Sequence, residues 1–161
     1  KAVRLADYRG KYVVLEWTNP ECPFVRKHYS SGNMQSLQKE WGGRDVVWLA
    51  INSTRADHSE FKSPREMSDW MQTQGAAPAA TLLDSTSGAG RAYGAKTTPH
   101  MFVVDPAGKV VYAGAIDDKR SANPADAKTA HNYVRAALTE ATAGKPVSVA
   151  STTPYGCSVK Y

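Results

Sequence analysis

The chain has 161 residues, of which 42% are apolar and 22% are charged, and its formal net charge is +5 at pH 7. This length and balance suit one compact domain that buries more than half of the surface its unfolded chain exposes. The longest apolar run, Val46–Ile51, is far shorter than the ~20 residues that cross a bilayer, so no membrane span is expected. Acidic residues are interspersed among the basic ones, so the charge is interpreted as a solubility feature and no nucleic-acid partner is expected.

Strand and helix signals alternate from the start of the chain. Tyr12–Trp17 is rich in apolar and β-branched residues and is predicted to be a buried strand. Cys22 and Pro23 then open a helix, because proline suits the first helical position. This helix is expected to be interrupted near Ser31–Asn33 and to resume through Trp41.

The same alternation continues through the middle of the chain. Asp45–Asn52 is predicted to be a second buried strand. Ser63 and Glu66 form a capping-box pattern, so a helix should run from there to about Gln74. A short strand is expected at Ala80–Asp84.

The last elements are a helical turn, a hairpin and a helix. The turn is expected at Ala89–Tyr93, and the strands His100–Asp105 and Lys109–Ala113 flank a Pro-Ala-Gly hairpin signal. A long final helix is expected to start at Asn123 and to end before Gly144.

This order of elements predicts an α/β domain of thioredoxin-like fold, with a central mixed β-sheet flanked by helices and followed by a C-terminal tail. Residues 1–161 are interpreted as a single domain. Residues 145–161 are expected to form an irregular tail that carries Cys157, one of the chain's two cysteines. The two cysteines could be inert core thiols, form a structural clasp or carry out redox chemistry.

The other cysteine, Cys22, is predicted to lie between a buried strand and the start of a helix. The helix dipole and the unpaired N–H groups of the first turn favour a thiolate there, and the thiolate is the nucleophilic form. The position therefore favours redox chemistry over a buried structural cysteine.

The residues around Cys22 resemble those of a known superfamily. Glu16–Val25 is similar to the active-site segment of the thioredoxin/peroxiredoxin superfamily, and most of all to the peroxiredoxin-like redoxins of the alkyl hydroperoxide reductase/thiol-specific antioxidant class. That class ends in a Gly-Cys-Ser-(Ile/Val)-Lys-aromatic tail, which Gly156–Tyr161 matches. Thr98–Asp105 resembles the cis-proline strand of the superfamily, so the resemblance spans nearly the whole chain.

The resemblance implies roles for individual residues. Cys22 is the expected nucleophile, with Pro23 and Phe24 beside it in the substrate site. Thr98 and Pro99 are expected to complete that site, and the peptide bond between them is expected to be cis.

Two positions depart from the family pattern. Val25 stands three residues after Cys22, where a thioredoxin has its second cysteine. Asn19 stands three residues before Cys22, where relatives often have cysteine and peroxiredoxins have threonine. An adjacent dithiol is therefore excluded, and Asn19 is a candidate to supply a hydrogen bond at the site.

Four further residues are candidates with a functional and a structural interpretation each. Glu16 occupies the position where thioredoxins bury an acid for proton transfer, and the alternative is an edge or surface glutamate paired with a lysine. Arg120 could hold a thiolate or peroxide oxygen, as peroxiredoxins need, or be a solvated surface residue. His28 and His100 could join Cys22 around copper or zinc, but we interpret them as structural, and no metal site is assigned.

Cys157 has three possible roles. It could resolve a sulfenic acid on Cys22 into a disulfide, pin the tail to the domain as a static clasp, or remain a free thiol.

These observations favour a peroxiredoxin-like antioxidant enzyme that reduces peroxides through Cys22, with an external dithiol as reductant and no cofactor. The alternative is a thiol–disulfide oxidoreductase acting on protein disulfides, and a further one is a non-enzymatic binding module or copper carrier. The sequence leaves the oligomeric state open. It also leaves the compartment open, with export favoured over the cytoplasm because Leu5–Lys11 resembles a segment that normally follows an N-terminal hairpin.

Overall fold

The protein is organised around one five-stranded mixed sheet, here in a computed structural model that describes residues 1–161. Its strands are β1 (Tyr12–Trp17), β2 (Val46–Asn52), β3 (Ala80–Leu83), β5 (His100–Val104) and β6 (Val110–Gly114). They lie in the order β3-β2-β1-β5-β6. The first three are parallel, whereas β5 is antiparallel to both of its neighbours. The predicted strands and the mixed sheet are confirmed.

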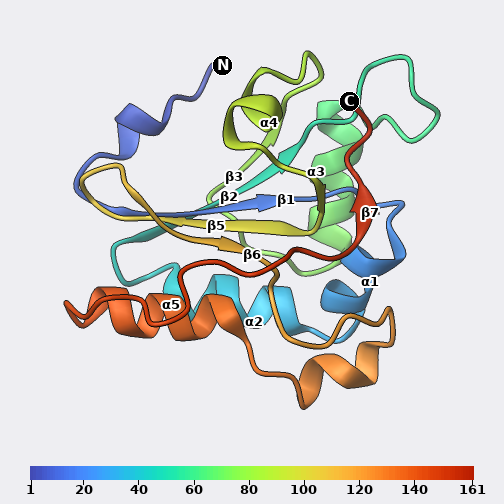
Figure 1. Ribbon diagram of the computed structural model, residues 1–161. Helices are drawn as coiled ribbons and strands as arrows, with labels where there is room; N and C mark the ends of the chain where they lie inside the picture. Colours follow the sequence, from blue (N-terminus) through green and yellow to red (C-terminus); the bar gives the residue numbers. More distant parts are fainter.

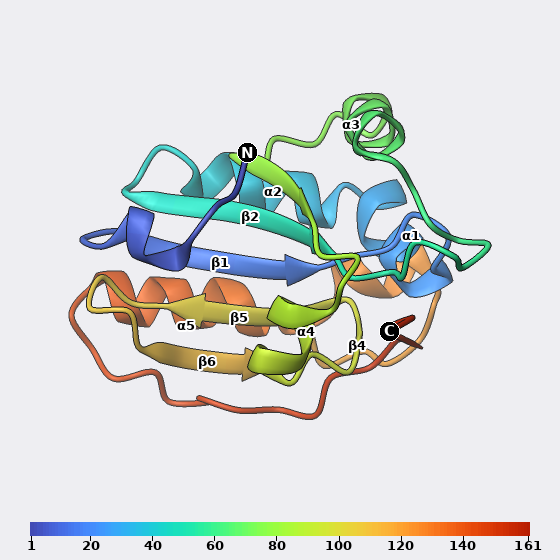
Figure 2. The ribbon, with the colours of Figure 1, turned by 90° about the horizontal axis from the view of Figure 1, so that it is seen from above.

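Helices cover both faces of this sheet. They are α1 (Pro23–Ser30), α2 (Asn33–Trp41), α3 (Pro64–Thr73), α4 (Gly88–Tyr93) and α5 (Tyr133–Thr142), with short 3-10 helices at Leu5–Tyr8 and Pro124–Lys128. Figure 1 shows α2 and α5 below the sheet and α4 above it, and Figure 2 shows the strands side by side from above. None of the helices combines the length and apolar character that crossing a bilayer requires.

An apolar core lies on each face of the sheet, and alternate side chains of β1 contribute to each of them. Val14 faces the core that α1, α2, α3 and α5 cover. Leu15 and Trp17 face the second core, beneath α4 and the N-terminal 3-10 helix. Successive strand residues point to opposite faces, so a strand buried on both sides must be apolar at nearly every position. Glu16 is the one charged residue in β1, and the side chain shares the first face with Val14.

The helix boundaries follow the expected capping chemistry. In α3, Oγ of Ser63 accepts from the Glu66 N–H at 3.1 Å, and the Glu66 carboxylate accepts from the Ser63 N–H at 2.9 Å, so the predicted capping box is confirmed. Between α1 and α2, Gly32 has φ +77°, a left-handed conformation that glycine adopts without strain.

The prediction of one long final helix from Asn123 is wrong. Asn123 caps only the 3-10 turn Pro124–Lys128, and α5 starts afresh after Asn132, whose side chain accepts from the Arg135 N–H at 2.8 Å. Between the two helices the chain pairs back onto Asp117, through a bridge to Asn132. This tertiary contact interrupts a sequence that is helical in its local preferences.

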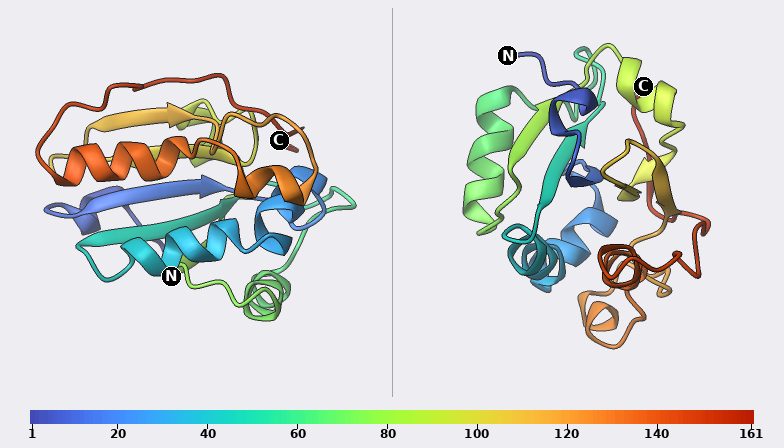
Figure 3. Two further views of the ribbon diagram at one scale, coloured as in Figure 1. Left: turned by 90° about the horizontal axis from the view of Figure 1, so that it is seen from below. Right: turned by 90° about the vertical axis from the view of Figure 1, so that its left-hand side faces the viewer.

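The C-terminal tail is more ordered than the sequence indicates. It runs beside β6, where the Ala113 N–H donates to Ala150 and the Ala113 carbonyl accepts from the Thr152 N–H, and Figure 3 shows its path around the domain. It ends in a short strand, β7 (Cys157–Ser158), which is antiparallel to β4 (Thr97–Thr98). A two-residue strand has no periodicity that sequence analysis could detect. This pairing brings the second cysteine to the first.

Candidate active site: two thiols at the end of the central strand

Cys22 is the N-cap residue of α1, just beyond the end of β1. Its backbone N–H donates to the carbonyl of Asn19 at 3.0 Å, which shapes the turn that leads into the helix. Its thiol is only 1% exposed and donates to the carbonyl oxygen of Thr98 at 3.2 Å. The reactive sulfur is therefore held between the start of α1 and β4.

The first turn of α1 leaves two backbone donors next to Cys22. The N–H groups of Phe24 and Val25 make no hydrogen bond, whereas the N–H of Arg26 already donates to the Cys22 carbonyl. Unpaired N–H groups at a helix start favour a nearby negative charge. These two groups are the local donors that can stabilise a thiolate on Cys22.

Cys157 lies against Cys22. In the β4–β7 pair it is opposite Thr98, whose carbonyl binds the Cys22 thiol. The two cysteines are neighbours on either side of that carbonyl, and both are free thiols in this structure. Burial, together with the neighbouring Cys22 thiol, raises the pKa of Cys157 to about 11, so this residue is a protonated thiol at neutral pH. Cys157 is also the more accessible of the two cysteines.

The backbone between the cysteines is tightly packed. The Thr98–Pro99 peptide bond is cis, as predicted. Gly156, which has φ +145°, approaches the Thr98 carbonyl so closely that a Cβ atom there would overlap it. Only glycine can occupy this position while β7 keeps its pairing with β4.

Glu16 is completely buried, so the interpretation as an edge or surface glutamate paired with a lysine is wrong. Its carboxylate accepts from Tyr29 Oη at 2.7 Å, Trp48 Nε1 at 2.8 Å and Gln38 Nε2 at 3.4 Å. Burial raises its pKa above the ordinary value, and these hydrogen bonds partly oppose that shift. Its bonds reach none of the cysteines, and a role in proton transfer stays a prediction.

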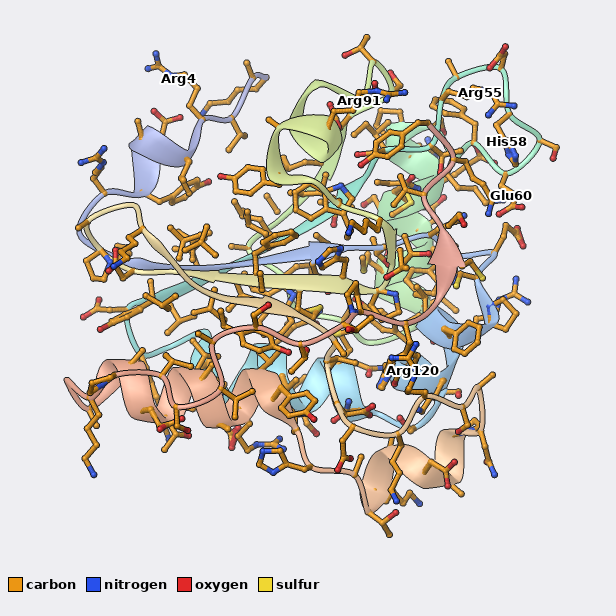
Figure 4. The ribbon with its side chains drawn as sticks, in the orientation of Figure 1. Arg4, Arg55, His58, Glu60, Arg91 and Arg120 are labelled. Carbon is orange, nitrogen blue, oxygen red and sulfur yellow. The ribbon has the colours of Figure 1, made fainter.

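The side chains of Asn19 and Arg120 make no hydrogen bond to the Cys22 sulfur. The Asn19 amide donates to Glu60 at 2.9 Å, and its oxygen accepts from the Glu21 N–H at 3.0 Å. Arg120 is exposed, donates to the Thr153 carbonyl at 3.4 Å and lies over the ring of Tyr155 (Figure 4). Arg120 therefore borders the tail, whereas the Asn19 side chain connects the turn before α1 to Glu60.

The remaining candidates divide between the site and the core. Pro23 is exposed beside Cys22, and the half-buried ring of Phe24 packs edge-to-face on Tyr155 at 5.8 Å. His28 and His100 have other partners: burial lowers their pKa values to about 3 and about 4, respectively. Neither imidazole contacts Cys22 in any hydrogen bond of the structure.

A cluster of buried polar residues escaped the sequence analysis. Lys27, His28, Asp117 and Tyr155 meet at the side of α1, where the tail crosses it. The His28 ring contacts Tyr155 through Nε2 and Asn33 through Nδ1, at 3.1 and 2.9 Å. A neutral ring with its proton on Nε2 satisfies both contacts, because the Asn33 amide is a donor. These residues are far apart in sequence, and no spacing connects them.

A cavity of about 590 Å³ lies under α4 on the other face of the sheet, lined mainly by apolar side chains that include Leu15, Ile51 and Leu82. Neither cysteine lines it. The two cysteines lie instead beyond the end of β1, beside the Thr98 carbonyl.

A mixed sheet with a cysteine at the first helix start, a cis-proline strand beside it and a neighbouring second thiol defines a thiol-dependent oxidoreductase of thioredoxin-like fold. The model of the AhpC/TSA family matches residues 1–113, and the chain belongs to this family.

Solved structures share this fold. An uncharacterized conserved protein from Geobacillus kaustophilus is 31% identical, with a TM-score of 0.84 over 99% of this chain and 82% of that one. A hypothetical protein from Sinorhizobium meliloti is 25% identical, with a TM-score of 0.78 over 98% of this chain and 84% of that one. The thioredoxin domain of a thiol-disulfide oxidoreductase from Bacteroides vulgatus shares the fold at 19% identity, with a TM-score of 0.55 over 70% of this chain and 76% of that one. The curated proteins contain no match.

Proposed function

We propose that the protein reduces hydroperoxides, with Cys22 as the attacking thiol and Cys157 as the resolving thiol in the same chain. The observation that carries this proposal is that Thr98 binds the Cys22 thiol through its carbonyl and is directly opposite Cys157 in the β4–β7 pair, so the two thiols are neighbours in the reduced protein. A resolving thiol that is already in place can close the disulfide without unfolding the helix that carries Cys22.

The proposed cycle has three steps. The Cys22 thiolate attacks an oxygen of the hydroperoxide, the O–O bond breaks, and the other oxygen takes a proton and leaves as an alcohol or water. Cys22 is then a sulfenic acid. The Cys157 sulfur displaces the hydroxyl group, which leaves as water with the Cys157 proton, and the Cys22–Cys157 disulfide forms. An external dithiol reduces this disulfide by two exchanges and becomes a disulfide itself.

The burial of Cys22 supports a small oxidant. At 1% exposure, under a tail paired to β4, the sulfur is accessible to a hydroperoxide far more easily than to a folded protein. The free N–H groups of Phe24 and Val25 would stabilise the attacking thiolate in place of a side-chain cation.

The same geometry indicates where the reductant attacks. Cys157 is the more accessible sulfur, and Cys22 has the free N–H groups of the first turn of α1 beside it to receive the negative charge of a leaving sulfur. The external dithiol is therefore proposed to form its mixed disulfide with Cys157 and to release Cys22.

The test is a rapid-mixing reaction of the fully reduced protein with hydrogen peroxide, with a sulfenic-acid trap and mass spectrometry to locate the product. We expect fast oxidation at Cys22, and a Cys22–Cys157 disulfide when the trap is absent. Cys157→Ser should be oxidised at the same initial rate but accumulate the sulfenic acid, and Cys22→Ser should not react. Oxidation of Cys22 no faster than that of free cysteine would refute the proposal.

A second candidate is thiol–disulfide exchange with proteins, and the β4–β7 pairing favours it. The edge of β4 beside Pro99 accepts an extended segment, here the chain's own tail. A client segment that replaced β7 would place its cysteine near Cys22. A mixed disulfide trapped between Cys157→Ser and a disulfide-bonded client, with no matching reaction with peroxide, would select this function over the first.

A further inference from the structure

A buried polar cluster lies at the side of α1, where the C-terminal tail crosses the helix on its way to Cys157. The Tyr155 hydroxyl donates to Oδ1 of Asp117 at 2.6 Å. It accepts from Nζ of Lys27 at 2.9 Å and contacts Nε2 of His28 at 3.1 Å. All four residues are at most 4% exposed. One hydroxyl thus uses its full hydrogen-bonding capacity on three side chains.

This cluster joins the two segments that carry the thiols. Lys27 and His28 belong to α1, which has Cys22 as its N-cap. Tyr155 precedes Cys157 by two residues and leads directly into β7. The hydroxyl is therefore a link between the helix of one cysteine and the strand of the other.

The surroundings make the link sensitive to the loss of a single oxygen atom. Oδ2 of Asp117 has no hydrogen-bond partner, and Nζ of Lys27 is 3.9 Å from Oδ1. Beyond Tyr155, the Asp117 carboxylate accepts only from the Lys119 N–H at 3.1 Å. A buried carboxylate that loses its closest donor is stabilised by hydration, and lifting of the Tyr155 segment from α1 would open this one to water.

We propose that Tyr155 is a positioning residue for the redox reaction, whose hydroxyl keeps the Cys157 segment docked on the Cys22 helix before oxidation. This inference rests on the proposed cycle through Cys22 and Cys157. The residue does not touch the reacting atoms. It sets the fraction of reduced molecules in which the resolving thiol is in contact with Cys22.

The closing experiment measures that fraction with glutathione. Reduced protein and glutathione disulfide exchange to give the Cys22–Cys157 disulfide and two molecules of glutathione, so the equilibrium constant reports how well Cys157 is placed. Tyr155→Phe keeps the ring but removes the hydroxyl. We expect the constant to fall about tenfold, a change of about 30 mV in potential, because a hydrogen bond to charged partners is lost.

A matched control separates positioning from general stability. Tyr12 donates its hydroxyl to the Ala141 carbonyl at 2.8 Å, away from both cysteines. Tyr12→Phe should lower thermal stability but leave the glutathione equilibrium unchanged. In the Cys157→Ser background, Tyr155→Phe should speed alkylation of Cys22 by iodoacetamide about tenfold, because the tail no longer covers the sulfur.

Two results would overturn the inference. One is a glutathione equilibrium that Tyr155→Phe leaves unchanged, and the other is a wild-type protein that forms no Cys22–Cys157 disulfide with glutathione. The equilibrium uses no peroxide, so slow oxidation by hydrogen peroxide would refute the proposed function alone. Fast oxidation with an unchanged equilibrium would refute only the role of Tyr155.

Discussion

The carbonyl oxygen of Thr98 lies 3.2 Å from Sγ of Cys22, and in the β4–β7 pair Thr98 is also directly opposite Cys157. One backbone unit thereby contacts both thiol-bearing segments, although these come from opposite ends of the chain. Changes to the packing around this carbonyl should act mainly on the closure of the disulfide. The first oxidation of Cys22 depends instead on the start of α1.

Gly156→Ala tests the packing at Thr98 directly. The new Cβ would overlap the Thr98 carbonyl, so β7 must move, and we expect a loss of about 2–4 kcal/mol in the free energy of unfolding. Disulfide closure should slow in parallel. Gly144→Ala is the control, since Gly144 also has positive φ but nothing lies within 4 Å, and it should cost only about 1 kcal/mol. Urea unfolding measures the free energy of unfolding of both variants. Equal losses in Gly156→Ala and Gly144→Ala would contradict the close packing of Gly156 on Thr98.

The raised pKa of Cys157 predicts a distinct pH profile for its alkylation. At pH 8 the thiol is protonated, because its pKa is about 11, and its reaction with iodoacetamide should be slow and rise through pH 10. Cys22→Ser removes one cause of the shift and should move the profile to lower pH. Site-resolved mass spectrometry over pH 7–11 measures this, and identical profiles in the two proteins would show that the thiols do not interact.

His28 should make the protein sensitive to acid. Its pKa falls from 6.5 to about 3 on folding, mainly through burial, so below pH 6.5 the unfolded chain binds a proton that the folded chain does not. Stability from this group is present above pH 6.5 and is lost toward pH 3, by about 1.4 kcal/mol per pH unit. The free energy of unfolding, measured with urea between pH 7 and 4, should fall less steeply with falling pH in His28→Gln than in the wild type. An equal dependence on pH in the two proteins would contradict the role of His28 in acid sensitivity.

Glu16 should have an opposite effect on stability. Its pKa is raised above 4.5 in the folded protein, so the folded state retains the proton more firmly than the unfolded state. Stability therefore falls as the pH rises from 4.5 through the raised folded-state pKa. Glu16→Gln has no proton to lose and should lack this fall in the same unfolding series. If Glu16 also transfers protons, the variant should slow disulfide closure at constant stability.

The sequence predicted most of the fold, because the strands of this sheet are apolar on both faces. Tyr12–Trp17 is predicted as a buried strand from its composition alone, and the break at Gly32 and the capping box at Ser63 are local signals that the structure confirms. The prediction of one final helix is wrong at residues 129–132, where the chain is not helical. A tertiary bridge between Asp117 and Asn132 competes there with local helix preference.

The candidate site was predicted only in part. The position of Cys22 at a strand–helix junction is visible in the sequence, and so is the proline after Thr98. The approach of Cys157 to Cys22 was only one of several alternatives, because it depends on a two-residue strand and on a glycine that admits close approach. The polar cluster at Tyr155 was missed for a similar reason: lysine, histidine and aspartate are ordinarily surface residues, and only the folded tail buries them.

The positions of the two cysteines also affect how the protein withstands unfolding. Cys22 follows the first strand and Cys157 lies in the last, so one bond between them would close nearly the whole chain into a ring. Loop-closure entropy assigns such a ring of more than 100 residues a stabilisation of about 5 kcal/mol relative to the open chain. The oxidised protein should therefore be the more heat-resistant form. A thermal unfolding curve would then measure the fraction of the protein that is oxidised and has not yet been reduced by the external dithiol.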